Sequence, residues 1–138
     1  MIRKAMLTAL TLGAAPAFAQ LPAFAQAPGD AFFVPSGQSV SLIEVLPDAM
    51  ADGLSLRLRF LAPAIAEPGF SFDDAVADME ALCREFGLDL LENSYPDAVR
   101  IIVSLSDRPV EFGVQDPEST QFFEAYTPDN GDCIWEEF

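Results

Sequence analysis

Apolar and polar residues alternate most strictly over residues 54–60, which read Leu-Ser-Leu-Arg-Leu-Arg-Phe. Successive side chains of a strand point to opposite faces, so the apolar residues line one face while Ser55, Arg57 and Arg59 line the other. A β-rich run at residues 40–46 precedes this segment across a polar connection. The two segments therefore predict an antiparallel hairpin with one buried face.

Residues 71–87 have the pattern of one amphipathic helix. Ser71 is a good N-cap, and Gly87 is expected to end the helix as the residue after its C-cap. Residues spaced three and four apart form an apolar face, which consists of Phe72, Ala75, Val76, Met79, Cys83 and Phe86. Asp78 and Glu80 fall outside that face. The sequence predicts no other helix with comparable clarity.

Three further strands are expected after the helix. Residues 99–106 and 120–126 are rich in β-branched or aromatic residues, and Asp129-Asn130-Gly131-Asp132 predicts a tight turn into a last strand at residues 133–138. The predicted order is β-β-α-β-β-β, an α+β domain with one helix packed on a mostly antiparallel sheet. The single helix leaves one face of this sheet uncovered, and we call it the open face.

Cys83 and Cys133 are the two cysteines of the chain. In an exported protein such a pair predicts one disulfide. Because Cys83 lies on the helix, Cys133 then faces the helix-covered side of the sheet, and Trp135 faces the same side. We therefore expect Trp135 to be a core residue beside the disulfide; the alternative is a tryptophan that stacks on a ligand.

The first 26 residues have the layout of a secretory signal: a basic head, an apolar stretch and a repeated Ala-Phe-Ala-Gln motif. The apolar stretch is too short for a stable membrane anchor. We expect a signal peptide at residues 1–19, with Ala25 as its alternative end, a flexible lead-in at residues 20–33 and a single domain at residues 34–138. The protein is then periplasmic or secreted, without stable membrane insertion after signal removal.

The charge balance is strongly acidic. Of seven basic residues, Arg3 and Lys4 lie in the signal, so the remaining five face all 22 acidic residues, a net charge of −17. This field repels nucleic acid and anionic membranes, and leaves cationic proteins, cations or neutral ligands as partners. We expect Arg57 and Arg59 to form cross-strand salt bridges; the alternative is an anion-binding patch that includes Arg100.

The missing residue types narrow the chemistry. The chain has no histidine, and its one lysine precedes residue 5. Ser-His and Cys-His pairs, Schiff-base lysines and imidazole metal sites are thereby excluded. A phosphate-binding P-loop would need a lysine and a Gly-rich segment that do not occur. We therefore expect a protein that is not an enzyme and that carries no cofactor and no metal ion.

Two places are candidate binding sites. Asp107 and Arg108 follow the strand at residues 99–106, where the arginine fork can hold a carboxylate or phosphate; a turn with a local ion pair is the simpler interpretation. Phe123 and Phe138 are expected on the open face, where exposed aromatic surface often marks a partner site. A hydrolase or lyase that works through Asp107, and cation binding by acidic residues such as those of the 129–132 turn, are alternatives.

Three segments carry a resemblance. They are residues 103–113, 116–126 and 133–138, the last of which reads Cys-Ile-Trp-Glu-Glu-Phe. They are similar to a family of small exported bacterial proteins with no assigned function, and the likeness extends over residues 34–138. The resemblance implies no catalytic or binding residue. Some relatives carry an acetolactate-synthase name, but we do not expect that activity, because the diphosphate-binding motif and the several hundred residues of a thiamine enzyme are missing.

The sequence therefore predicts a non-catalytic binding or interaction domain of the cell envelope. Its expected partner is an envelope protein or a small ligand, held at the open face or at the loop that carries Asp107 and Arg108.

Overall fold

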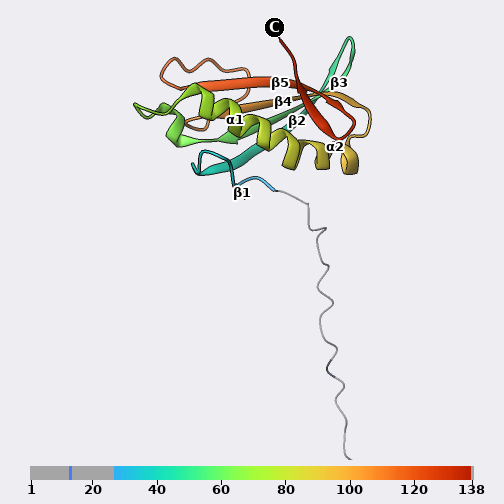
Figure 1. The fold of residues 1–138 in the computed structure, drawn as a ribbon, viewed down its shortest axis with the longest axis horizontal. Helices are drawn as coiled ribbons and strands as arrows, with labels where there is room; N and C mark the ends of the chain where they lie inside the picture. The colour runs from blue at the N-terminus through green and yellow to red at the C-terminus, as the bar shows by residue number, and fades with distance from the viewer. Residues whose placement is uncertain (1–12, 14–26, 138) are drawn as a thin grey trace, which may run out of the picture.

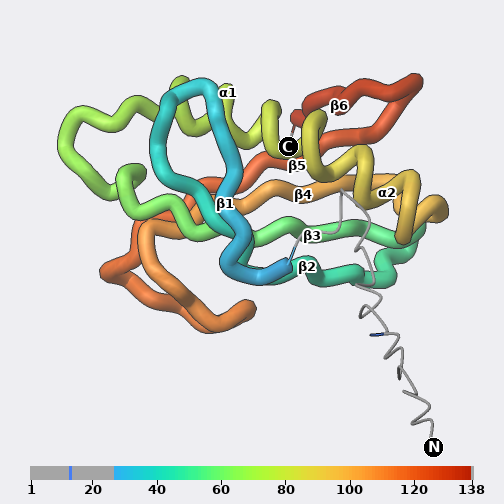
Figure 2. Tube along the Cα trace, turned by 90° about the horizontal axis from the view of Figure 1, so that it is seen from below, coloured from blue at the N-terminus to red at the C-terminus, as the bar shows by residue number. Residues whose placement is uncertain are grey.

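The computed structural model describes residue 13 and residues 27–137. A six-stranded sheet has the strand order β1-β2-β3-β4-β5-β6 (Figures 1 and 2). The strands are β1 (Ala31–Phe32), β2 (Val40–Met50), β3 (Gly53–Leu61), β4 (Ala98–Ser106), β5 (Gln121–Asp129) and β6 (Asp132–Trp135). Neighbouring strands are antiparallel except β3 and β4, which run parallel.

The connection from β3 to β4 carries the helices, since a parallel pair needs a long crossover. It contains the 3-10 helix η1 (Pro63–Ala66), then α1 (Phe72–Leu82), the π-helical turn η2 (Cys83–Gly87) and α2 (Leu88–Ser94). The last three follow one another without a break and lie along the sheet (Figure 1). The predicted architecture, one helix on a mostly antiparallel sheet, is confirmed. Within the described part of the chain, no helix has the length and apolarity needed to cross a bilayer.

The predicted element order missed one short strand. β1 precedes the hairpin and pairs with Val40 and Ser41 of β2. Its Phe32 ring packs against Phe60 and Phe86, with centroid distances of 5.3 and 5.0 Å. Two residues are too few for alternation to predict a strand, and the sequence does not show that Phe32 reaches this aromatic cluster. Residues 1–12 and 14–26, which include most of the predicted signal and part of the lead-in, lie outside the described residues.

Gly87 does not end the helix, so that prediction was wrong. Its φ of −61° and ψ of −45° are helical, and the chain continues through η2 into α2. A Cβ on Gly87 would lie 3.3 Å from side-chain atoms of Ile101 and Leu58. The glycine therefore permits the helix to approach the sheet closely at the π turn, rather than providing a left-handed cap.

The core lies between the helices and the predicted apolar face of β3. Fully buried side chains of three elements form its centre: Leu56, Leu58, Phe60, Ala75, Met79, Ile101, Val103 and Leu105. Burial of a large apolar side chain contributes about 1.5–3 kcal/mol. The alternation at residues 54–60 thus correctly predicted which face of β3 the helix covers.

Asp78 is an exception to the expected polar face of α1, because it is fully buried. Its carboxylate accepts hydrogen bonds from the Ser36 amide at 2.9 Å, the Ser36 hydroxyl at 2.5 Å and the Gln38 side-chain amide at 2.7 Å. These three donors compensate for the lost hydration of the carboxylate. Asp78 therefore fastens the turn before β2 to the helix.

The disulfide between Cys83 and Cys133 is confirmed and joins η2 to β6. The prediction for Trp135 was wrong: this side chain is 55% exposed. Trp135 does pair with buried Tyr126 and so shares its face, but β6 is the edge strand and the helices do not cover the indole. Instead, its Nε1 donates a hydrogen bond of 2.6 Å to the Glu124 carboxylate.

Candidate functional site

Residues 107–120 form a long loop between β4 and β5 that folds over the open face. On β3, Arg57 and Arg59 alternate with buried Leu58 and therefore lie on that face. The Phe112 ring of the loop lies 5.2 Å from the guanidinium carbon of Arg57 and 5.7 Å from that of Arg59. The open face is thus partly covered by the loop.

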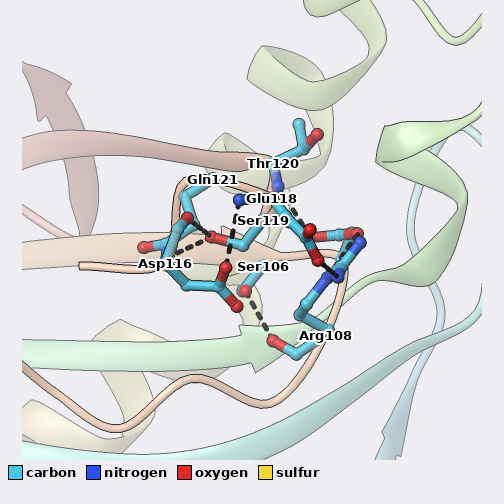
Figure 3. Close-up of polar contacts among 8 residues, drawn as sticks. Ser106, Arg108, Asp116, Glu118, Ser119, Thr120 and Gln121 are labelled. Carbon is cyan, nitrogen blue, oxygen red and sulfur yellow. Dashed lines mark hydrogen bonds and ion pairs between the residues drawn. The ribbon is translucent and has the colours of Figure 1, made fainter. Parts of the chain in front are cut away.

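The base of the loop is closed by Asp107. Its backbone amide donates to the Thr120 carbonyl at 3.0 Å, and its carboxylate accepts from the Thr120 amide at 2.7 Å. Arg108 donates to the same carboxylate through Nε at 3.1 Å and Nη2 at 3.0 Å. The Ser106 hydroxyl donates to the Arg108 carbonyl at 2.6 Å (Figure 3). The two ends of the loop are therefore fixed side by side.

These contacts favour the ionised form of the Asp107 carboxyl, whose side chain is 6% exposed. Burial by itself raises its pKa, but the hydrogen bonds from Arg108 and Thr120 outweigh burial, and the pKa lies below its usual value. A carboxylate with this pKa and with its acceptor positions occupied is a poor general base. Asp107 and Arg108 thus form the local ion pair that the simpler interpretation predicted.

We expect Asp107→Asn to lower the free energy of unfolding at neutral pH by about 2 kcal/mol, because a neutral amide replaces the buried carboxylate that accepts from Arg108 and from the Thr120 amide. Since the folded-state pKa is depressed, the stability contributed by Asp107 is present above the unfolded pKa, about 3.9, and is lost as the pH falls through the folded value. Urea denaturation of both proteins between pH 7 and pH 2.5 measures this difference.

Asp116→Asn is the matched control in the same loop. Asp116 accepts the Glu118 amide at 3.0 Å near the surface, a turn contact that asparagine also makes. The free energy of unfolding of the Asp116→Asn protein should stay within about 0.5 kcal/mol of that of the parent protein. An Asp107→Asn protein as stable as the control at pH 7, or a deficit that persists unchanged to pH 2.5, would contradict the assigned role.

Arg59 supports the centre of the loop. Its side chain is buried; Nη1 forms an ion pair with Glu44 directly across on β2, and Nη2 donates to the Val110 carbonyl. The cross-strand salt bridge predicted for Arg59 is thereby confirmed. Because both ends of its guanidinium are engaged within the protein, Arg59 serves as a structural link between sheet and loop.

Arg57 differs from its neighbour. Within residues 27–137, no hydrogen bond or ion pair engages its guanidinium, so the cross-strand salt bridge predicted for Arg57 is wrong. Burial and the positive charge of Arg59 lower the pKa of the Arg57 guanidinium. The negative charge of Asp48 raises it, but by less, so the pKa lies below its usual value. Arg57 is thus a partly desolvated cation whose described contact is the Phe112 ring.

Arg57 lies in a pocket of about 260 Å³ between the sheet and the loop. Its lining comprises Arg57, Arg59, Ser104, Val110, Glu111, Phe112, Gly113, Val114, Gln115, Gln121, Phe122 and Phe123. We call this cavity the loop pocket. Three of its apolar side chains are more than half exposed: Phe112, Val114 and Phe123. The pocket therefore combines a cationic group with apolar walls that are open to solvent.

Of the residues predicted to form binding sites, only some line the loop pocket. Phe123 lines the loop pocket, as expected for an aromatic residue of the open face. Asp107 and Arg108 do not line it but fix the ends of the loop, and Phe138 lies outside the described residues. The contribution of Arg57 was foreseen only as an alternative, and Phe112 was missed because nothing in a loop sequence indicates what the loop covers.

The remaining charged candidates have local partners. Arg100, expected to join an anion patch, pairs instead with Asp52 at 2.9 Å and Glu136 at 2.8 Å. The 129–132 segment is the predicted turn, in which Asn130 and Gly131 have φ values of 50° and 76°. Among the residues that the structure describes, no three carboxylate or cysteine side chains are grouped so that they could hold a metal ion.

Comparison with known proteins gives a family and no function. No curated protein and no solved structure shows significant similarity to the chain. A family model described as a family of unknown function, DUF6497, matches residues 11–138, which include every strand and helix described above. The chain is therefore a member of the DUF6497 family.

Proposed function

We propose that this protein is a binding domain without catalytic activity that works in the periplasm or outside the cell, and that its ligand occupies the loop pocket. The observation that carries the proposal is the Arg57 guanidinium, which lies in a cavity without an ionic partner among residues 27–137. Buried or half-buried charges are normally paired. A ligand that forms an ion pair with Arg57 explains why the protein itself supplies no such partner within these residues.

The composition of the pocket supports binding rather than catalysis. Among the described residues that line it, the ionisable groups are Arg57, Arg59 and Glu111. Arginine stays protonated and does not transfer protons, and the exposed carboxylate of Glu111 has no hydrogen bond within the described residues to Ser104, the hydroxyl of the lining. The alternative hydrolase through Asp107 is disfavoured because that carboxylate is held by Arg108 and Thr120.

The proposed extracytoplasmic location is supported by the sequence pattern of residues 1–26 and by the disulfide. Disulfides persist in oxidising compartments, so the Cys83–Cys133 bridge suits a secreted protein. A small ligand is favoured over an envelope protein because the apolar groups of the open face surround a concave pocket instead of a flat patch.

A fragment screen by NMR tests the proposal. Fragments of mixed charge are added to the purified, disulfide-bonded protein, and amide shifts are mapped on the sequence. We expect hits to move amides of the loop pocket, such as those of Phe112, Gln115 and Phe123. The control is the Glu92 region of α2, which lines a separate shallow depression. Hits that cluster elsewhere, or a screen without any pocket hit, would refute the assignment of the site.

A further inference from the structure

We infer that the loop pocket binds a small monocarboxylate with a flat apolar body; this inference deepens the proposed function and rests on it. The other four arginines after residue 4 all pair with carboxylates, in the contacts Arg59–Glu44, Arg84–Asp132, Arg100–Glu136 and Arg108–Asp107. With 22 acidic residues in the chain, a shortage of acids does not explain the exception at Arg57.

The contacts of Arg57 leave its hydrogen-bond donors available. The guanidinium carbon of Arg57 lies over the Phe112 ring, 5.2 Å from its centroid. The N–H donors of a guanidinium lie in its plane and point outward from its edges. Among residues 27–137 no carboxylate or carbonyl oxygen accepts from these donors, so the fork that binds a carboxylate with two hydrogen bonds remains available beside the Phe112 ring.

The surrounding charge favours a monoanion over a phosphate dianion. Arg59 is already paired with Glu44, so Arg57 is the one arginine of the pocket lining without an ion pair to any of residues 27–137. Glu111 lines the pocket, and Asp48 is close enough to affect the pKa of Arg57. A phosphate dianion bound to Arg57 would keep one unmatched negative charge, which these carboxylates would repel. A monocarboxylate carries one negative charge, which Arg57 alone matches.

The walls and the size of the pocket define the rest of the ligand. Phe112, Val114 and Phe123 present exposed apolar surface around it. Aromatic side chains favour flat apolar groups in stacked or edge-on arrangements. A volume of about 260 Å³ falls below the range of about 300–1,000 Å³ typical of sites for drug-sized molecules, so the body is of one-ring size.

Three neutral polar side chains line the pocket: Ser104, Gln115 and Gln121. Gln121 donates to the Ser119 hydroxyl, whereas the side chains of Ser104 and Gln115 have no hydrogen bond to any of residues 27–137. A hydroxyl and an amide can each donate to a carboxylate oxygen or accept from a substituent on the ring. The pocket thus provides donors for both carboxylate oxygens.

Calorimetric and NMR titrations with three probes test the inference: benzoate, its neutral isostere benzamide, and inorganic phosphate. We expect benzoate to bind in the loop pocket at least tenfold more tightly than benzamide or phosphate, about the factor that one charge-assisted contact contributes. Arg57→Gln should weaken benzoate at least tenfold. Arg57→Lys, which keeps the charge and loses the fork, should weaken it by a smaller factor.

The matched control is Arg84→Gln, which removes the same charge from an arginine on the helix side that is paired with Glu80 and Asp132. It should change the benzoate affinity by less than twofold. The comparison of benzoate with benzamide needs no variant, so it stays decisive even if a substitution disturbs folding.

The outcomes separate the inference from the proposed function. Equal binding of benzoate and benzamide in the loop pocket would overturn the anion assignment and leave the pocket as a binding site. Tighter binding of phosphate would overturn the monocarboxylate assignment. An equal loss of benzoate affinity in Arg57→Gln and Arg84→Gln would show only a general charge effect and would overturn the role of Arg57. The mixed-charge fragment screen tests the pocket itself.

Discussion

Replacement of Cys83 and Cys133 together by alanine should lower the free energy of unfolding by about 4 kcal/mol. The disulfide spans 50 positions in the sequence. In the chain-entropy model, a cross-link over that distance removes much of the freedom of the unfolded chain. Such a loss is a large part of the ~5–15 kcal/mol by which a domain of this size is stable.

The location of the disulfide adds a local consequence. β6 has one neighbour in the sheet, β5, and its other edge is free of strands within the described residues. The Arg84–Asp132 ion pair beside the disulfide has both side chains 49% exposed, so solvent screens it and it adds little to the stability of β6. Without the disulfide, β6 should therefore separate from β5 more readily than the other strands separate from their neighbours.

Denaturant unfolding of the alanine double variant, with the reduced parent protein as the matched comparison, measures the global effect. Hydrogen exchange of the β6 amides measures the local one. Both proteins should lose similar stability, and exchange should accelerate first at Cys133–Trp135. A loss below about 1 kcal/mol, or faster exchange spread evenly over the sheet, would contradict the structural role of the bridge.

Arg59→Gln should cost about 2–3 kcal/mol, because it removes charged hydrogen bonds from a buried position. The Val110 carbonyl loses its donor, and Glu44, which is 38% exposed, loses its cation. Glu44 can regain hydration, so the cost falls below the 3–5 kcal/mol typical of a fully buried pair. The loop should also detach from the open face, since Arg59 links the two.

The control is Arg57→Gln, the same substitution two residues earlier on the same face of β3. Arg57 has no ionic partner within residues 27–137, so its removal leaves no group unsatisfied there. Its stability should lie within about 1 kcal/mol of the parent protein. Thermal or urea unfolding compares the two variants. Equal losses in both would show that Arg59 is not the specific link between sheet and loop.

The sequence predicted the parts of the fold that depend on local periodicity. Alternation at residues 54–60 identified β3 and its buried face, and the Asn130-Gly131 turn identified the last hairpin. Gly87 is a position where local periodicity no longer predicts the structure. A glycine that ends a helix and a glycine that permits close packing look alike in sequence, and only the nearby side chains of Leu58 and Ile101 distinguish them.

Trp135 and Arg57 show a second limit of sequence reasoning. Strand alternation correctly placed Trp135 on the helix side, but it could not show that an edge strand extends beyond the helix. The shared strand face predicted cross-strand salt bridges for Arg57 and Arg59, which is correct for Arg59 and wrong for Arg57 within the described residues. The loop pocket depends on where residues 107–120 fold, a long-range property that local patterns do not contain.

The most direct measurement of the central claim is NMR of the arginine Nε–Hε signals during addition of benzoate. Each guanidinium gives its own signal, so an ionic contact at one arginine is seen separately from the others. The proposed site predicts a saturable shift of the Arg57 signal while those of Arg84, Arg100 and Arg108, already paired with carboxylates, stay in place. An Arg57 signal that stays unmoved at saturating benzoate, or equal shifts of all arginine signals, would contradict it.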